Sequence, residues 1–586
     1  MREFFKMLAA SILGCALVLF AGVFFMLGLI AVLISSGSSE VKTIPSNSIL
    51  QIAFEKPLME QNSINPLSKA VPFDLYQDDG YGYFDWVSAV DRAAADDRIQ
   101  MIYLNTNYLS AGISQIEELR EALRRFRSTG KAIVAYSDSF SQGGYYLASI
   151  ADKVYLNPRG EINLRGFAIS VRYYKGLMDE LGVEAQFIRH GAYKSGGEPF
   201  VQQQMSVQER AQLERFLESA WNHWASEIAN ARQVTLQSVN QIAERAGCTN
   251  TEEAKELQFI DEAYYKDQLI ERLCLLQSVK NEKQLRVVNI QNYIAHKQTV
   301  RAKEKIALLF ASGALYMGSG QGDIMSENYI RTIRMLRADS SIKAVVLRVD
   351  SPGGDASAAA VIHRELTLLK EVKPLIVSIG DDAASGGYWI SCAGDHIIST
   401  PASFTGSIGA YSIAYNGQKG INKWLKVNVE TVRTHTSSDM GSIYRPMNAS
   451  ELAIIQKSID ETYHHFVSTV AHDRGLTFEE TDALAQGRIW SGVDALNHGL
   501  IDQIGGLYDA IRYAALSARL TDYQVVEYPA VHTFWERLMQ SVSAQSRASS
   551  LGADPQKWTE EIENAIWQAA QRGVQAKTPF MYQIVY

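Results

Sequence analysis

The chain has 586 residues, 56 Lys and Arg against 64 Asp and Glu, a net charge of −8 and 47% hydrophobic residues. A length beyond the roughly 250–300 residues that one hydrophobic core serves indicates several domains. The acidic balance disfavours a nucleic-acid-binding protein, so we expect no nucleic-acid partner. The Cys and His residues show no metal-ligand spacing, so we expect neither metal nor cofactor, while a single Cys248–Cys274 disulfide stays open.

The first apolar segment, residues 7–34, contains no charged residue and follows Arg2 and Lys6 in the short N-terminus 1–6. It is longer than the roughly 20 residues that span a bilayer and than the roughly 7–15 apolar residues of a cleavable signal peptide. A loose lipoprotein-type match at 12–15 is followed by more apolar residues, which favours an uncleaved anchor. By the positive-inside rule we predict a single-pass protein of the inner (cytoplasmic) membrane, with its bulk on the periplasmic side.

Strands and helices alternate after the anchor. Apolar runs predict strands at 48–54, 99–104 and 132–136, and helices fall between them at 86–95 and 113–126. The second helix carries apolar residues at 3/4 spacing, namely Ile116, Leu119, Leu123 and Phe126. This alternation predicts an α/β fold with parallel strands.

The same order recurs downstream, with strands at 306–310, 342–349 and 375–378 and a helix at 358–369. Ile99 and Ile342 are 243 residues apart (342 − 99), and "GGYYLASIADKVYLNP" at 143–158 matches "GGYWISCAGDHIISTP" at 386–401 with the same offset. The chain is therefore predicted to be a tandem duplication, packed face to face about a pseudo-two-fold axis. We expect homologous domains at 46–285 and 300–525, a linker near 277–303, and a partly helical C-terminal tail at 526–586.

Three differences between the copies indicate separate roles. Ser407, in Thr405-Gly406-Ser407-Ile408-Gly409, is matched by Leu164 in the first copy. Lys194 falls on Ser438 when the neighbouring Arg residues are registered, so a Lys base would come only from the first copy. Finally, "DSPGG" at 350–354 ends a strand only in the second copy, and a Gly-Gly pair there exposes backbone N–H groups suited to an oxyanion.

A second serine competes with Ser407 for the role of nucleophile. Ser385 opens a helix in "AASGG" at 383–387, and its counterpart in the first copy is Gln142. A helix N-terminus would stabilise an oxyanion, which favours Ser385. The sequence leaves this alternative open.

Together these motifs resemble the long, duplicated form of the signal peptide peptidase A (protease IV) family of serine proteases. The matching strings are "TGSIG" at 405–409, "AYKSGGEPF" at 192–200, "DSPGG" at 350–354, "ASGGYW" at 384–389 and "GRIWSGVDALNHGLIDQIGG" at 487–506. The resemblance covers nearly the whole chain from the anchor to about residue 525. It implies tandem crotonase/Clp-protease-like domains and a homotetramer.

The resemblance also implies the chemistry. Ser407 would be the nucleophile and Lys194 the base of a Ser–Lys dyad, with the N–H groups of Gly354 and Gly353 as oxyanion donors. The expected activity is a membrane-anchored endopeptidase that degrades cleaved signal peptides and other apolar peptides through an acyl-enzyme. Acyl-CoA chemistry of the crotonase type and a non-catalytic membrane scaffold are the competing classes. A Ser407–Lys194 separation beyond ~10 Å, well past hydrogen-bond reach, would favour the scaffold.

A lysine acting as the base imposes a requirement on its surroundings. A free Lys has a pKa of about 10.4, which must fall by about 3 units at a cost of roughly 4 kcal/mol. We therefore predict that the two halves bury Lys194, and that Ser195 or a Thr within 431–434 positions its amine. The two residues could meet within one chain or across neighbouring protomers.

Overall fold

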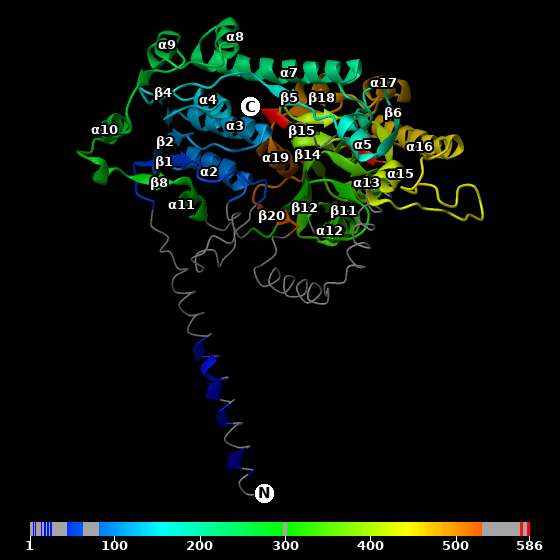
Figure 1. Ribbon diagram of the computed structural model, residues 1–586. Coiled ribbons are helices and arrows are strands. Elements are labelled where there is room, and N and C mark those ends of the chain that lie inside the picture. The colour runs from blue at the N-terminus through cyan, green and yellow to red at the C-terminus, as the bar shows by residue number, and fades with distance from the viewer. Residues whose placement is uncertain are drawn as a thin grey trace.

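The computed structural model describes residues 44–61, 81–296, 302–320, 322–529, 575–577 and 583–585, together with scattered positions between 4 and 25. Two α/β halves lie side by side (Figure 1). Most of the predicted anchor at 7–34, and the part of the tail predicted to be helical, lie outside these residues. Among the residues described, none of the helices is both long and apolar enough to cross a bilayer.

A six-stranded parallel sheet forms the centre of the first half. Its spatial order is β7 (Glu262–Ala263), β4 (Lys153–Leu156), β3 (Ala132–Ser137), β2 (Ile99–Asn105), β1 (Ser48–Ala53) and β8 (Val287–Asn289). Parallel strands covered on both faces need near-continuous apolar runs, and β2 is buried at five of its seven positions. The alternating pattern of the sequence thus gives the predicted parallel sheet.

Helices cover this first sheet. The predicted helix at 113–126 is confirmed as α3, and Ile116, Leu119, Leu123 and Phe126 are all buried in the core. Burying each such side chain contributes roughly 1.5–3 kcal/mol. The helices of this half are α2 (Tyr83–Ala95), α3 (Ile113–Ser128), α4 (Gln142–Ala148), α5 (Lys175–Leu181), α6 (Glu198–Val201), α7 (Val207–Arg232), α8 (Leu236–Glu244), α9 (Thr251–Glu256), α10 (Lys266–Gln277), η1 (Glu282–Gln284) and α11 (Ile290–Ala295).

The second half repeats the first sheet. Its order is β19 (Gln503–Ile504), β15 (His396–Ser399), β14 (Leu375–Ala384), β12 (Ile342–Ser351), β9 (Lys305–Ser312) and β20 (Gln524–Tyr528), again parallel throughout. Position by position this is the order of the first sheet, so the predicted duplication is confirmed at the level of topology. Two further strands, β16 (Phe404–Gly406) and β18 (Ile489–Ser491), extend the sheet beside the end of β14.

The helices of the second half enclose its sheet from both sides. One core cluster joins the sheet to α13, α14 and α16, whereas α19 packs against β12 and β14 within the cluster that also holds α2 and α3 of the first half. The halves therefore share a core. The helices are α12 (Ser326–Ala338), α13 (Ala356–Lys370), α14 (Gly386–Ser391), α15 (Gln418–Gly420), η2 (Ile421–Leu425), α16 (Ala449–Arg474), α17 (Phe478–Leu484), α18 (Gly492–Asn497) and α19 (Leu507–Ser517).

The boundaries of the halves differ in detail from the predicted ones. Residues 277–303, expected to be a linker, contribute β8 and α11, and β8 pairs with β1 as the sixth strand of the first sheet. At the other end, β20 carries the second sheet to Tyr528. A three-residue strand such as β8 is too short to give a strong sequence signal, and here tertiary pairing decides its conformation.

A third sheet joins the two halves. β6 (Glu184–His190) of the first half pairs antiparallel with β17 (Ala410–Asn416) of the second along all seven residues. The full order is β11 (Ile324–Met325), β10 (Leu315–Tyr316), β13 (Gly353–Asp355), β21 (Gln575–Lys577), β17 and β6. Separately, β22 (Gln583–Val585) pairs with β5 (Ala168–Ser170) of the first half.

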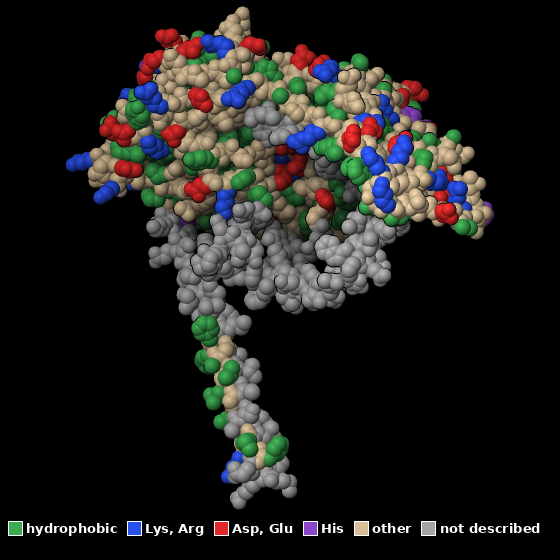
Figure 2. Space-filling model, viewed as in Figure 1, with side chains coloured by type: hydrophobic (Ala, Val, Ile, Leu, Met, Phe, Trp, Pro, Cys, Tyr) green, Lys and Arg blue, Asp and Glu red, His purple; other side chains and the backbone are tan. Residues whose placement is uncertain are grey.

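Residues 421–445, which we call the arm, extend from the second half away from the body (yellow, right side of Figure 1). Apolar side chains are exposed along it, including Trp424 at 59% and Val432 at 100%. Acidic and basic side chains are interspersed over the whole face shown in Figure 2, including the arm. Exposed apolar side chains also occur elsewhere among the described residues, such as Val207 at 80% and Leu516 at 73%, so the arm shares this feature with other parts of the surface.

Candidate active site

Lys194 lies in the loop that follows β6, so the pairing of β6 with β17 carries it from the first half into the second. Its loop is tied to the second half by Tyr193 N–H, which donates to the carbonyl of Gln486 (2.8 Å). Gly487 makes this approach possible, because a Cβ there would lie 2.5 Å from Lys194 Cβ and its φ is +76°. The absence of a side chain at Gly487 thus allows the loop that carries Lys194 to pack directly against the second half.

Ser407 lies between β16 and β17. Its backbone N–H donates to the carbonyl of Arg488 (2.7 Å), and its φ of 51° is unusual for a residue with a side chain. The short segment 486–488 therefore holds both loops, through Gln486 on the lysine side and Arg488 on the serine side. Backbone strain of this kind is maintained only where the surroundings fix the conformation.

The structure brings Lys194 and Ser407 into direct contact within one chain. Lys194 Nζ lies 3.0 Å from Ser407 Oγ and 2.8 Å from the Ser407 carbonyl oxygen. Lys194 is 1% exposed and Ser407 2%. The separation beyond ~10 Å that would favour a scaffold is not what the structure has.

Ser385 also contacts the amine, at 2.6 Å from Oγ to Nζ, and it is fully buried. It precedes α14 with φ 57° and ψ −117°, and its N–H donates to the Gly406 carbonyl (2.7 Å). The expectation that a Thr within 431–434 positions the amine is wrong, and the side chains that contact Nζ here are Ser385 and Ser407. Ser195 Oγ accepts from Gln212 (3.5 Å), and Thr431 and Thr434 are exposed on the arm.

Burial lowers the pKa of the Lys194 ammonium well below its usual value. The physical cause is that a charged amine loses its hydration in the interior, while the two serines offer only neutral dipoles. A neutral amine carries two N–H donors and one lone pair. With one N–H directed to the Ser407 carbonyl and the other to Ser385 Oγ, the lone pair is left for the Ser407 hydroxyl.

The two oxyanion candidates, Gly353 and Gly354, lie in β13. Gly353 N–H donates to Ser351 Oγ (3.2 Å), and its φ of +95° requires glycine. Gly354 pairs with Leu315, whose carbonyl oxygen would lie 2.2 Å from a Cβ added at Gly354. One strand, β21, lies between β13 and β17. These glycines are therefore separated by a single intervening strand from β17, the strand that follows Ser407.

Sequence reasoning missed the residues that support the two loops. Gln212, on α7, donates from Nε2 to the Tyr193 carbonyl (3.1 Å) and accepts at Oε1 from the Ile489 N–H (3.2 Å). The Arg488 guanidinium lies over the Tyr193 ring, 5.0 Å from its centroid. Arg488 falls in the "GRIWSG" string, so a signal existed there, whereas Gln212 lies in an ordinary amphipathic helix without one.

A group of carboxylates lies at the ends of β12 and β14, beside the Ser351–Gly354 turn. Burial raises the pKa of Asp350 well above its usual value, and Asp381 adds to the shift; burial together with Asp381 raises that of Asp382 to about 7. Asp381 itself accepts from Ser114 N–H and Oγ, both at 2.7 Å, at the N-terminus of α3. The raised pKa values mean that these carboxyl groups hold protons more readily than exposed ones, and Asp381 joins the two halves through Ser114.

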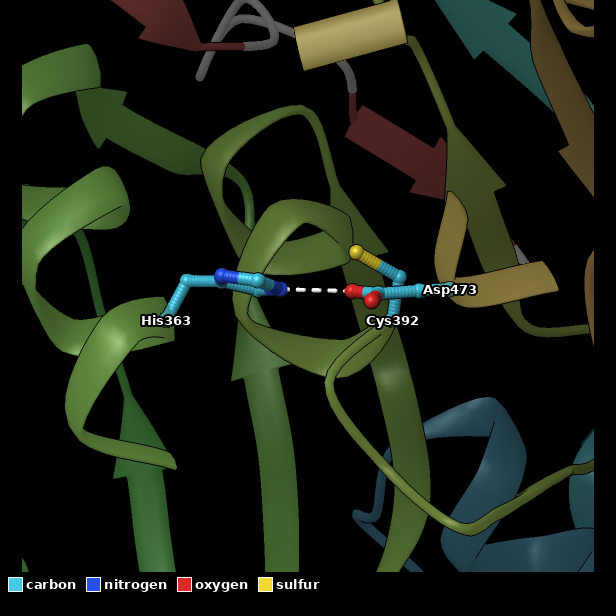
Figure 3. A group of neighbouring side chains, drawn as sticks. All are labelled: His363, Cys392 and Asp473. Carbon is cyan, nitrogen blue, oxygen red and sulfur yellow. Dashed lines mark hydrogen bonds and ion pairs between the residues drawn. The ribbon is translucent and has the colours of Figure 1, made fainter. Parts of the chain in front are cut away.

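One further cluster has metal-ligand chemistry: His363, Cys392 and Asp473, drawn in Figure 3. His363 Nε2 and Asp473 Oδ2 are 2.6 Å apart, a hydrogen-bond distance. Two ligand atoms each about 2.0–2.1 Å from a tetrahedral zinc would lie more than 3 Å apart, so the geometry is that of a hydrogen-bonded pair. Burial raises the pKa of the Cys392 thiol, and Cys248 and Cys274 are free, so the open disulfide alternative is not formed.

Comparison with known proteins gives matches along both halves. The model of "Peptidase family S49" matches residues 125–280 and 367–521, and the "Clp protease" model matches 296–405. The chain is 33% identical to "Protease 4" of Salmonella typhi over 477 residues, 79% of this chain and 76% of that protein. It is 31% identical to "Protease 4" of Haemophilus influenzae (strain ATCC 51907 / DSM 11121 / KW20 / Rd) over 491 residues, 81% and 80% of the two chains. A "Putative signal peptide peptidase SppA" of Enterococcus faecium is 32% identical over 234 residues, 39% of this chain and 67% of that protein.

Proposed function

Because the chain belongs to peptidase family S49 and is a serine protease, we propose that Ser407 and Lys194 form its catalytic dyad. The observation that carries the proposal is the buried contact of 3.0 Å between Lys194 Nζ and Ser407 Oγ. A general base must lie within hydrogen-bond reach of the proton that it takes, and its lone pair must be free at working pH. Burial of Lys194 supplies the second condition by lowering its pKa.

The reaction proceeds through an acyl-enzyme. Ser407 Oγ attacks the scissile carbonyl carbon while Lys194 Nζ takes the hydroxyl proton. The tetrahedral intermediate collapses as Lys194 passes that proton to the leaving amine, and the C–N bond breaks. Water then attacks the ester, Lys194 again takes a proton, and Ser407 is released with its hydroxyl restored.

Three acceptors surround the ammonium that forms transiently on Lys194. They are the Ser407 carbonyl, Ser407 Oγ and Ser385 Oγ, which equal the three N–H donors of a protonated lysine. Ser385 thus serves as the positioning residue, and Ser407, which leads into β17, is the nucleophile. Backbone N–H groups of β13 are the proposed oxyanion donors, and losing one such donor would cost about 2.7–4 kcal/mol.

The proposed substrates are apolar peptides in extended conformation, including cleaved signal peptides. This follows the name of the Enterococcus faecium relative and the uncharged segment 7–34, which would tether the enzyme to the inner membrane with its bulk on the periplasmic side. The proposed assembly is a homotetramer. The exposed apolar side chains of the arm, Trp424 and Val432 among them, support contact with a neighbouring copy.

The test is hydrolysis of a fluorogenic signal-peptide-like substrate by the full chain and three variants. Ser407→Ala and Lys194→Met should each lose at least about 10³-fold in kcat, as expected when members of a concerted unit are removed. Ser385→Ala should retain measurable turnover. The control is Ser438→Ala, which removes an exposed hydroxyl on the arm and should match the wild type.

Two results would contradict the dyad. Activity surviving in both Ser407→Ala and Lys194→Met would exclude these residues from the chemistry. Abolished turnover in Ser385→Ala together with an active Ser407→Ala would transfer the nucleophile to Ser385.

A further inference from the structure

The proposed base lies in a loop without regular secondary structure. Residues 191–197 join β6 to α6 and include three glycines. Glycine-rich backbone is conformationally free, which opposes a fixed position for Lys194. Catalysis requires such a position, because a displacement of about 1 Å costs on the order of 10²-fold in rate. Contacts beyond the local backbone conformation must therefore hold the Lys194 main chain.

An ion pair closes this loop. Arg189, on β6, donates from Nη1 to the Lys194 carbonyl oxygen (3.0 Å) and to Glu198 Oε1 (2.7 Å). The side chain of Glu198, the first residue of α6, is 1% exposed, and that of Arg189 is 28% exposed. One nitrogen of the guanidinium thus joins the strand before the loop, the main chain of Lys194 and the helix after the loop.

The Glu198 carboxylate keeps the guanidinium in this position. A buried carboxylate loses its hydration and needs a cation or several donors as partners, so breaking its pair with Arg189 is costly. Hydrogen bonds between ionised groups are also roughly twice as strong as those between neutral groups. The Lys194 carbonyl, a neutral acceptor, therefore receives a donor whose direction the carboxylate has already set.

The rest of the loop packs against aromatic side chains. A Cβ added at Gly197 would lie 2.1 Å from Phe187 on β6, and one added at Gly196 would lie 3.0 Å from the Tyr411 ring on β17. The two glycines therefore allow the loop to lie flat on the strand pair that joins the halves. Aromatic packing fixes one part of the loop, and the ion pair fixes the Lys194 carbonyl.

We propose that Arg189 and Glu198 are positioning residues, whose ion pair holds the Lys194 main chain so that Nζ meets Ser407 Oγ. Arg189 contacts Lys194 at the main-chain carbonyl, so the pair acts through the loop and not on the amine itself. This inference rests on the proposed function, because it gives the pair a role only through Lys194 as the base.

The first experiment measures hydrolysis of the fluorogenic peptide by variants of the full chain. Arg189→Met and Glu198→Ala should each lower kcat about 10- to 100-fold with KM nearly unchanged, because they displace the base and leave substrate contacts in place. The double variant should lose no more than the more impaired single variant, since both changes break one ion pair. Glu198→Gln, which keeps an acceptor for Arg189, should stay within about threefold of the wild type.

Glu365→Ala is the matched control. Glu365 is a buried glutamate, 9% exposed, that pairs with Arg334 and Arg337 on α12, so this variant breaks an ion pair of the same kind outside the lysine loop. It should have the kcat and KM of the wild type. Losses in Arg189→Met and Glu198→Ala no greater than the loss in Glu365→Ala would overturn the proposal. Losses that multiply in the double variant would show two separate effects and would overturn it as well.

The pH profile separates a positioning role from a general loss of stability. Burial lowers the pKa of Lys194. A loosened loop admits water to the amine, so in Glu198→Ala this pKa should rise towards its ordinary value. The acid limb of kcat/KM should then move to higher pH, whereas a loss of stability alone would leave this limb in place.

Charges around the loop give a second possible effect on the amine, of opposite sign. The charged or titratable side chains on the surrounding elements are Arg189 and His190 on β6, Glu198 on α6, Glu209 on α7, Tyr411 on β17, and Arg488. Burial, and none of these groups, is the cause of the lowered pKa of Lys194, so Glu198→Gln should keep the wild-type acid limb. A shift to lower pH in both Glu198 variants would assign the effect to the lost negative charge and would contradict the positioning role.

Hydrogen exchange distinguishes failure of this inference from failure of the proposed function, since it needs no turnover. The Lys194 and Glu198 amides donate within the loop, to the carbonyls of Gly191 (3.2 Å) and Ser195 (2.8 Å). Both amides should be protected in the wild type and in Glu365→Ala, and should exchange faster in Arg189→Met. If Lys194→Met keeps full activity, the proposed function fails, while the exchange result still decides whether the ion pair holds the loop. Equal exchange in the wild type and Arg189→Met would refute the proposal.

Discussion

At the scale of single residues, the site depends on how many partners one amine has. Lys194 Nζ is surrounded by Ser385 Oγ, Ser407 Oγ and the Ser407 carbonyl, and burial lowers its pKa. Activity should therefore fall as the pH falls through this lowered pKa, because the protonated lysine has no lone pair to take the serine proton. Ser385 sets both the orientation of the amine and the position of this acid limb.

Replacing Ser385 should change both properties. Ser385→Ala leaves one N–H of the buried ammonium without an acceptor, which disfavours the charged form. We expect the acid limb of the kcat/KM profile to move to lower pH. We also expect kcat to fall about 10- to 100-fold, the value of a hydrogen bond to a charged group of roughly 1.5–3 kcal/mol.

The positive φ of Ser385 provides a control. Ser385→Gly lacks the hydroxyl but accepts this backbone conformation without strain, so it should show the same shift as Ser385→Ala. Wild-type behaviour in Ser385→Gly would mean that backbone strain, and not the hydroxyl, accounts for the effect.

At the scale of elements, the site is assembled by one strand pairing and by one short segment that hydrogen-bonds to two loops. The β6–β17 pairing brings the lysine loop to the second half, and segment 486–488 accepts backbone hydrogen bonds from both loops. These contacts are made by backbone atoms, so side-chain identity hardly constrains them except at Gly487. Displacing this segment should separate the two proposed catalytic groups.

Gly487→Ala tests this segment. The added Cβ would lie 2.5–2.7 Å from the Lys194 backbone and Cβ, so the lysine loop must move. A displacement of about 1 Å costs on the order of 10²-fold in rate, which is the loss of kcat that we expect in the hydrolysis assay.

Gly499→Ala is the matched control for this change. Gly499 has nearly the same φ, +71°, with open space around its Cα, so the variant carries similar backbone strain without displacing Lys194. Equal losses of kcat in the two variants would show that strain alone is responsible and would contradict a positioning role of segment 486–488.

At the scale of the whole molecule, buried acids connect the docking of the halves to pH. Glu117 on α3 accepts from Trp224 Nε1 (2.8 Å) in its own half and from the Ala402 N–H (3.2 Å) in the other. Burial raises its pKa from 4.5 to about 8. Between these values the folded protein holds a proton that the unfolded chain releases, so stability is greatest at low pH and is lost as the pH rises through this window.

Glu117→Gln should remove this dependence, because an amide mimics the protonated acid at every pH. We expect the wild type to lose roughly 1–3 kcal/mol more than the variant between pH 5.5 and pH 8.5, measured as the difference in free energy of unfolding. Other titrating groups contribute equally to both proteins and cancel in the comparison. A wild type and variant with parallel pH profiles would show that Glu117 is ionised in the folded state.

The sequence predicted the repeated sheets well, for a local reason. The periodicity of strands and helices is visible within a short stretch of sequence, and α3 and β2 lie where their patterns predicted them. The internal comparison went further, since it singled out Ser407 and Lys194, whose side chains are in contact. The comparison was informative because, in a duplicated chain, the second copy provides a homologous residue for each position of the first.

The remaining features depend on contacts that leave no local pattern. The hydrogen bond of Ser385 to Lys194 follows from the course of β14 relative to β6, in two different halves. The pairing of Gln575–Lys577 with β13 involves a strand of three residues, which is too short to show a hydrophobic period in the sequence. The 277–303 segment looked like a linker because a three-residue edge strand is too short to show a period.

The pairing of β6 with β17 also determines when the site can form during synthesis of the chain. A ribosome makes β6 and Lys194 first, and Ser407 only after a further 213 residues. The emerging first half contains a lysine without a nucleophile, and it gains the proposed activity only when β17 has been made and has paired with β6. The growing chain is therefore inert towards its own unfolded segments until the second half folds, because the two proposed catalytic groups meet only then.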